Sequence, residues 1–196
     1  MRKSKKYTVK YRRKRERKTD YKARLRLAKS GLPRLVVKPL INSFSAQIIE
    51  FSPKGDKVLA SANSSELKKL GYKLHCGNIP SAYLTGLLIG KKAINKGIKK
   101  AILDIGFAPS IKNSRVYSAL KGAIDAGLNV PSSDSIYPKE EILNGSKIQK
   151  YAESLSNDQE KYKKQFSNYL KNNVDPKKIS QHIEDIKKKV LSNEER

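Results

Sequence analysis

Residues 77–105 read GNIPSAYLTGLLIGKKAINKGIKKAILDI, and they predict a long helix followed by a short buried strand. Asn78 or Ser81 can cap the helix, with Pro80 in its first turn. Apolar side chains recur at helical spacing to about residue 97, and they are Tyr83, Leu84, Leu87, Leu88, Ile94 and Ile98. Residues 101–105 then have the composition of a buried strand, so the chain crosses back to a sheet by a helix.

Three segments of β-type composition precede this helix: PRLVVKPL at 33–40, FSAQIIEF at 44–51 and VLASA at 58–62. The last two are joined by a turn signal at 52–56, which predicts an antiparallel part of the sheet. A brief helical turn is expected at 64–67, and a second helix at 114–126, ended by Gly127. Strands and helices in this order predict an α/β body.

The charge of the chain is large and unevenly spread. Its formal net charge is +25, from 43 Lys and Arg against 18 Asp and Glu. Residues 1–29 hold 15 Lys and Arg against 2 Asp and Glu, so about half of the excess lies there. Such an excess favours a polyanionic partner, nucleic acid before an anionic membrane surface.

The basic N-terminal stretch also has the side chains that bind RNA. It is dense in arginines, which grip phosphate with two parallel hydrogen bonds: Arg12, Arg13, Arg15, Arg17, Arg24 and Arg26. Tyr7, Tyr11 and Tyr21 add rings for stacking on unpaired bases. Thr19 or Asp20 can cap a short helix that Gly31 ends. The competing interpretation of a basic run is a solvated tail.

The chain divides by composition into three parts. We expect a basic arm at 1–32, an α/β body at 33–131 and a helical C-terminal extension at 132–196. In the extension, Tyr162, Phe166, Tyr169 and Leu170 indicate one amphipathic helix. Asp175 and Pro176 open another, whose apolar stripe at Ile179, Ile183, Ile186 and Val190 requires a surface to pack on.

Catalytic chemistry is not expected. Cys76 is alone, which excludes a disulfide framework and a Cys-based zinc site and fits a reducing cytosol. Gly86 to Lys92 evoke a phosphate loop, but three residues separate the glycines where four are required, and no Ser or Thr follows the lysine. The pair His75–Cys76 is more readily a structural loop. No cofactor, metal or small-molecule substrate is predicted.

The sequence has no segment typical of membrane or secreted proteins. There is no apolar run of 18 or more residues and no secretory leader, so we expect no membrane role.

Asp104 ends a strand, where nuclease carboxylates often lie, but only Asp125 and Asp134 follow it in the body as further candidate metal ligands.

Several long blocks resemble a known family. They are VKYRRKRERKTDYKARLRLAKSGLPRLVV (9–37), LASANSSELKKLGYK (59–73), GNIPSAYLTGLLIGKKA (77–93), AILDIGFAPSIKNSRVYSALKGAIDAGLNVP (101–131) and QEKYKKQFSNYLKNNVDPKKI (159–179). In this order they resemble the large-subunit ribosomal proteins numbered eighteen, called five in eukaryotes, in the archaeal-type form.

The resemblance implies an α/β fold with a mixed sheet backed by helices, in the cytoplasmic ribosome. It implies a structural protein, not an enzyme, that binds 5S rRNA and helps to attach it to the large rRNA in the central protuberance, beside neighbouring ribosomal proteins. The implied RNA-binding residues are Lys10, Tyr11, Arg12, Arg13, Arg15, Lys18, Thr19, Tyr21, Arg24 and Arg26 in the arm, and Ser61, Asn63, Ser64, Asn113 and Arg115 in loops near the sheet edge.

Two other functions remain open from the residues alone. A DNA-packaging protein would be equally basic and would prefer duplex DNA to a folded RNA. An RNA-processing enzyme would require metal-dependent turnover that Asp104→Asn abolishes. A membrane-surface role is disfavoured because the basic segment lacks a large apolar face.

Overall fold

A mixed β-sheet lies at the centre of the protein. The structure, a computed structural model, describes residues 8–192. Its strands are β1 (Arg34–Pro39), β2 (Phe44–Glu50), β3 (Lys57–Asn63) and β4 (Ile102–Asp104). They are arranged in the order β3-β2-β1-β4. The β1–β2 and β2–β3 pairs are antiparallel, whereas β1 and β4 are parallel. This confirms the predicted α/β class with a mixed sheet.

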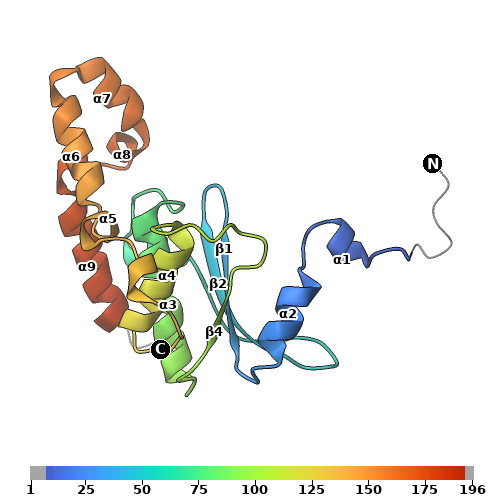
Figure 1. Ribbon diagram of the computed structural model, residues 1–196. Helices are drawn as coiled ribbons and strands as arrows, with labels where there is room; N and C mark the ends of the chain where they lie inside the picture. Colours follow the sequence, from blue (N-terminus) through green and yellow to red (C-terminus); the bar gives the residue numbers. More distant parts are fainter. Residues whose placement is uncertain (1–7, 193–196) are drawn as a thin grey trace, which may run out of the picture.

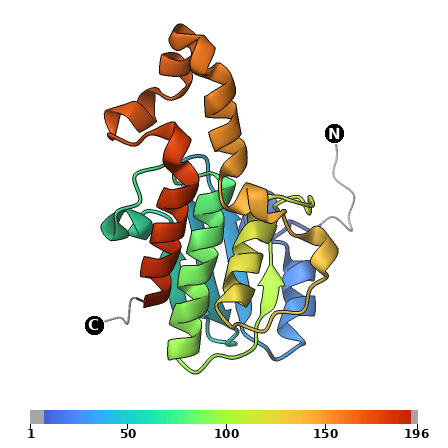
Figure 2. The ribbon, with the colours of Figure 1, turned by 90° about the vertical axis from the view of Figure 1, so that its left-hand side faces the viewer.

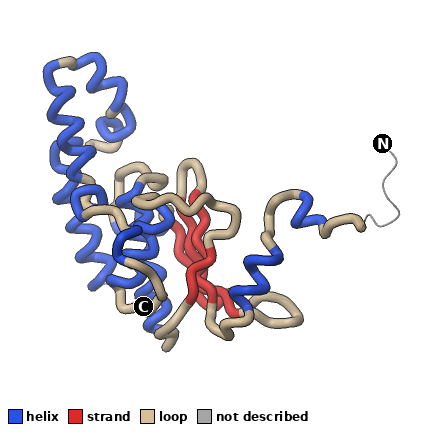
Figure 3. The backbone as a smooth tube through the Cα atoms, viewed as in Figure 1, coloured by secondary structure: helices blue, strands red, loops and turns tan. Residues whose placement is uncertain are grey.

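Helices account for most of the remaining chain (Figure 1, Figure 3). Those of the arm and body are α1 (Arg12–Arg15), α2 (Tyr21–Ala28), the 3-10 helix η1 (Glu66–Leu70), α3 (Ile79–Asn95) and α4 (Arg115–Asp125). Those that follow are η2 (Asp134–Ile136), α5 (Glu140–Leu143), α6 (Ser146–Ser154), η3 (Leu155–Asn157), α7 (Gln159–Gln165), α8 (Ser167–Lys171), η4 (Pro176–Lys178) and α9 (Ile179–Ser192). The arm and the helical extension expected from the sequence are both present.

One face of the sheet is covered by three helices that lie side by side. Figure 2 shows α9, α3 and α4 in a row in front of the strands. α3 contacts β2 and β3, α4 contacts β1, and α9 packs on α3. The predicted stripe of α9 is buried in this contact, at Ile179, Ile183, Ile186 and Val190. The hydrophobic core is therefore shared between the body and the extension.

Helix α3 begins and ends at the expected signals. Of the two possible caps, Asn78 is the one used, because its side chain accepts a hydrogen bond from the Ser81 N–H at 2.9 Å. Pro80 lies in the first turn, where its missing N–H costs nothing. After Asn95 the chain turns at Gly97, whose φ of +75° favours glycine.

Glycines bring α3 and α4 into close contact. A Cβ on Gly86 would lie 2.0 Å from the Ala119 carbonyl oxygen, and one on Gly122 would lie 2.2 Å from that of Tyr83. A Cβ on Gly90 would meet the Ala126 methyl group at 2.7 Å. The glycines of the sequence GLLIGKK are packing residues, and the phosphate-loop interpretation is excluded.

The extension differs from the prediction at one point. The single amphipathic helix expected through Tyr162 and Leu170 is two short helices, α7 and α8, which meet at Phe166. The Phe166 ring is buried and contacts the rings of Tyr151, Tyr162 and Tyr169 at centroid distances of 6.1, 5.2 and 5.7 Å. Phe166 has φ of −101° and ψ of 18°, so the regular helix is interrupted at the residue whose ring the three tyrosines surround.

Candidate nucleic-acid interface

The arm consists of two short helices joined at a capped turn. Asp20 caps α2, since its carboxylate accepts hydrogen bonds from the N–H groups of Lys22 and Ala23 at 2.9 and 3.2 Å. Thr19 instead accepts a hydrogen bond from Arg13 Nε at 2.9 Å, which ties α1 to the turn. The choice between Thr19 and Asp20 as the cap is thus resolved in favour of Asp20.

Of the three tyrosines predicted for the arm, Tyr7 lies outside the described residues, whereas Tyr11 and Tyr21 lie together. The rings of Tyr11 and Tyr21 have centroids 5.3 Å apart at an angle of 50°. Tyr11 is 73% exposed, while Tyr21 is half-buried. The pair offers one accessible aromatic surface within a group of cations.

Most of the predicted arm cations are at the surface: Lys10, Arg12, Arg13, Arg15, Lys18 and Arg26 are all exposed. Glu16 lies 2.9 Å from Lys18 Nζ and 3.6 Å from Arg12 Nε. Exposed ion pairs of this kind contribute about 0–1 kcal/mol and are easily exchanged for phosphate. The arm therefore presents a cluster of available positive charges.

Arg24 is the exception, because it belongs to the anchor of the arm. It forms an ion pair with Asp56 at 2.7 Å, and Asp56 also pairs with Arg34 at 2.6 Å. Arg34 is only 4% exposed and pairs in turn with Asp104 at 2.7 Å. This chain of charges attaches α2 to the sheet, on the side opposite to α3 and α4 (Figure 1). In the free protein Arg24 is thus a structural residue rather than an available phosphate ligand.

The same network explains Asp104, the residue on which a nuclease would depend. Its carboxylate is held by Arg34 and also accepts a hydrogen bond from the Gly106 N–H at 3.0 Å. Asp125 lies elsewhere, bonded to Tyr83 at 2.9 Å and to Lys121 at 3.0 Å. Within residues 8–192, no group of three or more His, Cys, Asp or Glu side chains is arranged to hold a metal ion.

The face of the sheet on which α2 lies is largely polar. Ser61 pairs with Gln47, and Asn63 pairs with Ser45, so these four side chains share that face. Lys38 on β1 pairs with Ser45, so its side chain lies on the same face, and it is exposed. Lys38, Ser45 and Gln47 were not predicted, although the alternation of polar and apolar residues in 44–51 was a sequence signal for them.

Ser64 does not belong to this surface. Its side chain is 0% exposed, and its Oγ accepts a hydrogen bond from the Phe44 N–H at 2.9 Å. The residue closes the end of the β2–β3 ladder, and this burial is why its predicted RNA contact is not supported. Asn63 is half-buried and its Oδ1 accepts from the Ser65 N–H at 3.0 Å.

The second predicted loop lies before α4. Asn113 is exposed, with φ of +59°, and its N–H donates to the Ile136 carbonyl at 3.1 Å. Arg115 Nη1 donates to the carbonyls of Leu40 and Gly77, each at 2.9 Å. Arg115 thus clamps two loops, and only its other guanidinium nitrogens are left for RNA.

Proteins similar to this chain belong to the large ribosomal subunit. The family model described as "Ribosomal large subunit proteins 60S L5, and 50S L18" matches residues 5–99 and 95–133. The chain belongs to this family. The "Large ribosomal subunit protein uL18" of Methanococcus maripaludis is 49% identical over 187 residues, which cover 95% of this chain and 97% of that protein. The predicted family and its archaeal type are confirmed.

Membership defines the role of this ribosomal protein at a coarse level. It is a structural component of the large subunit of the cytoplasmic ribosome, with rRNA as the partner class. The basic arm and polar sheet face are suited to that partner, because cations neutralise phosphates while hydroxyl and amide groups can bond 2′-hydroxyls. None of the helices described over residues 8–192 is long and apolar enough to cross a membrane.

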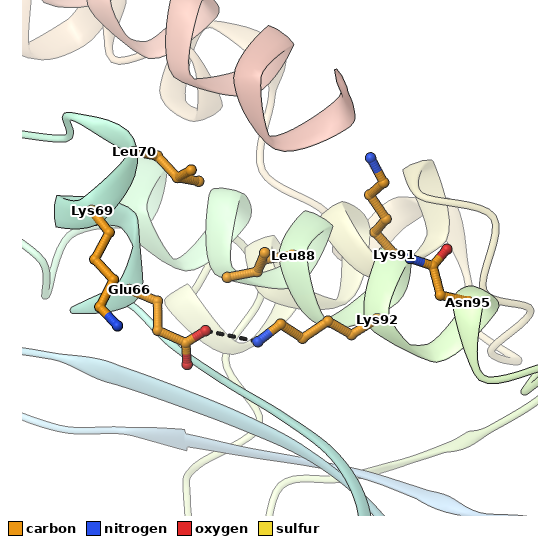
Figure 4. Close-up of a pocket in the computed structure, with 7 residues that line it drawn as sticks. All are labelled: Glu66, Lys69, Leu70, Leu88, Lys91, Lys92 and Asn95. Atoms are coloured by element: carbon orange, nitrogen blue, oxygen red, sulfur yellow. Dashed lines mark hydrogen bonds and ion pairs between the residues drawn. The ribbon is translucent and has the colours of Figure 1, made fainter. Parts of the chain in front are cut away.

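A small pocket of this ribosomal protein lies where η1 packs against α3 (Figure 4). Its volume is about 210 Å³. Lys92 pairs with Glu66 at 2.8 Å, and Lys91 donates to the Leu191 carbonyl at the end of α9 at 2.6 Å. Lys96 similarly donates to the Leu59 carbonyl at 2.6 Å. These three lysines of α3 and its C-terminal end thus bond to neighbouring elements of the fold.

Cys76, the single cysteine of this ribosomal protein, also has a structural role. Cys76 is buried, and burial raises the pKa of its thiol above the ordinary value. A raised pKa keeps the sulfur protonated and weakly nucleophilic. The adjacent His75 uses its Nδ1 to accept a hydrogen bond from the Gly77 N–H at 3.1 Å. The structural-loop interpretation of this pair is supported.

The Arg115 clamp can be tested by substitution. Arg115→Ala is expected to lower the free energy of unfolding by about 2 kcal/mol, because it removes two hydrogen bonds from a charged donor. Urea denaturation followed by circular dichroism measures the loss. Lys112→Ala, at an exposed position three residues away, is the control and should change stability by less than about 0.5 kcal/mol. Equal stability of the two variants would refute the clamp.

Proposed function

We propose that this ribosomal protein binds 5S rRNA and attaches it to the large rRNA in the central protuberance of the large subunit. Neighbouring ribosomal proteins are its further partners there. The observation that carries the proposal is the arm, whose cations are exposed while its root is fixed to the sheet by the Arg24–Asp56–Arg34–Asp104 network. An arm held in this way has a defined origin and a free surface for phosphates.

The proposed contacts fall into two groups. The arm contributes Lys10, Arg12, Arg13, Arg15, Lys18 and Arg26 as phosphate ligands, with Tyr11 and Tyr21 as a stacking surface. Ser61, Asn63 and the exposed part of Asn113 and Arg115 contribute polar contacts, joined by Lys38, Ser45 and Gln47 of the open sheet face. The division into arm (1–32), body (33–131) and extension (132–196) is part of the same proposal.

The mechanism is the release of counterions from RNA. Each phosphate that an arm cation neutralises frees condensed ions, which favours binding most strongly at low salt. About six to ten such contacts would lower the affinity by roughly a thousandfold or more between 50 and 200 mM salt. Recognition of a particular RNA then depends on contacts to its folded shape and its unpaired bases.

A competition experiment tests the proposal. Labelled 5S rRNA is bound to the full chain at 150 mM salt, and unlabelled 5S rRNA, transfer RNA and duplex DNA of equal nucleotide content are added as competitors. We expect only 5S rRNA to compete efficiently. Equal competition by duplex DNA would contradict the proposal and favour a DNA-packaging protein.

A further inference from the structure

A large groove separates the body from the extension. Its volume is about 1030 Å³. One wall is the loop from η1 to α3 with Asn42 of the β1–β2 turn, and the other wall is formed by α6, α7 and α8. A hydrogen bond joins the two walls, in which Asn172 Nδ2 donates to the Lys73 carbonyl at 3.0 Å. This site is separate from the arm and from the open face of the sheet.

The groove is lined by three kinds of side chain. Its cations are Lys68, Lys73 and Lys147, all exposed. Its amides are Asn42, Asn78, Gln165, Asn168 and Asn172, and its rings are Tyr72, His75, Tyr151, Phe166 and Tyr169. None of these described lining residues is acidic, so the groove carries only positive charge.

Two details indicate unused binding capacity. Tyr151 lines the groove and is 48% exposed, and its ring packs against that of Phe166 at a centroid distance of 6.1 Å. At the base of the groove, Asn78 Nδ2 is buried and has no hydrogen-bond partner among the described residues. Its Oδ1 accepts hydrogen bonds from the Ser81 N–H at 2.9 Å and from the Tyr72 hydroxyl at 3.3 Å, so the orientation of the amide is fixed. The half-exposed Tyr151 ring is suited to stacking on a nucleobase.

We propose that this groove binds unpaired nucleotides of RNA. The lysines contact phosphates, a base stacks on Tyr151, and the amides bond the base edges, which is the combination that single-stranded RNA requires. Amide side chains both donate and accept hydrogen bonds, so they match base edges that carry both kinds of group. Charge complementarity favours RNA over a basic protein segment, and the rings and amides exceed what an acidic peptide would use.

This inference rests on the proposed function, since it gives the same class of partner a second point of attachment. It adds that the extension binds RNA directly, at a place where the nucleic acid is not base-paired. The groove is lined by residues of the body and the extension and by none of the described arm residues. A reporter placed on α6 therefore measures the groove separately from the arm.

A single tryptophan provides the test, because the chain contains none. Tyr151→Trp puts a fluorescent ring at the edge of the groove, and Tyr162→Trp puts one on the same extension outside the groove, where Tyr162 also contacts Phe166. The probe is an unpaired heptaribonucleotide. We expect it to quench the tryptophan of Tyr151→Trp saturably and to leave that of Tyr162→Trp nearly unchanged, although the arm of both variants also binds the probe.

Removing the groove cations gives a second readout. In the Tyr151→Trp background, Lys68→Ala with Lys147→Ala should reduce the slope of log affinity against log salt by about 0.7 for each lysine. Lys163→Ala with Lys171→Ala, exposed on the extension and outside the groove, should leave the slope unchanged. Photo-crosslinking of a 4-thiouridine probe to the unsubstituted chain, mapped by mass spectrometry, does not depend on either tryptophan variant folding.

The outcomes separate this inference from the proposed function. Absence of selective quenching and of crosslinks to groove peptides, or a response to oligoglutamate in place of RNA, would overturn the groove proposal even where 5S rRNA is still preferred over DNA. Conversely, selective quenching together with equal binding of 5S rRNA and duplex DNA would support the groove and overturn the proposed function.

Discussion

Replacing Gly86 with alanine is expected to lower the free energy of unfolding by about 3 kcal/mol or more, since overpacking at a rigid contact commonly costs up to this amount. The added Cβ would lie 2.0 Å from the Ala119 carbonyl oxygen. Backbone cannot rotate away as a flexible side chain can, so α3 and α4 must separate. For a chain of this length the midpoint of thermal unfolding should fall by about 6–12 °C.

A second glycine near the end of the same helix is the control. Gly97 has φ of +75° and nothing within 4 Å of its Cβ position. Gly97→Ala therefore tests backbone strain without a clash, with an expected cost of about 1–2 kcal/mol. Calorimetry of both variants compares the two costs. A loss for Gly86→Ala no greater than that for Gly97→Ala would show that the helices can separate freely.

Neutralising the exposed arginines of the arm is expected to raise the dissociation constant for 5S rRNA by about a thousandfold at 150 mM salt. The variant carries Arg12→Ala, Arg13→Ala, Arg15→Ala and Arg26→Ala, which leaves Arg24 and its ion pair with Asp56 intact. Each lost phosphate contact should also reduce the salt slope by about 1. Fluorescence anisotropy over a range of salt concentrations measures both quantities.

Four exposed lysines of the extension provide the matched control for charge. Lys163→Ala, Lys164→Ala, Lys171→Ala and Lys188→Ala remove the same net charge from a different part of the chain. We expect the change in the logarithm of its dissociation constant to be less than about a tenth of the change in the arm variant, because these lysines are not among the proposed RNA contacts. If both variants lose affinity equally, binding follows total charge and the arm has no special role.

Much of the fold could be predicted because it is determined by local pattern. The strand segments have β-type composition, the glycines after α3 and α4 end those helices, and the apolar stripe of α9 recurs at helical spacing. The order β3-β2-β1-β4 could not be derived in this way, because the pairing of β1 with β4 joins residues far apart in the chain. The family resemblance, not periodicity, supplied the mixed sheet.

The candidate site shows the same limit more sharply. Exposed arm cations were predictable from composition, but the burial of Ser64 and the pairing of Arg24 with Asp56 depend on contacts across the fold. Arg115 has the sequence of a surface arginine and acts as a clamp between two loops. The groove was not predicted at all, because its walls come from segments about 70 to 130 residues apart that only the tertiary fold brings together.

The position of α9 in the chain has a consequence for biosynthesis. Translation delivers the arm first, and α9 follows every other described element, so the outer apolar face of α3 stays uncovered until Ile183, Ile186 and Val190 have emerged. During that interval the nascent protein combines a fully formed cluster of cations with an unfinished core. Incomplete chains of this kind are prone to aggregate and to attract nucleic acid without selectivity. A partner that covers the arm during synthesis would therefore protect the protein until α9 has packed on α3.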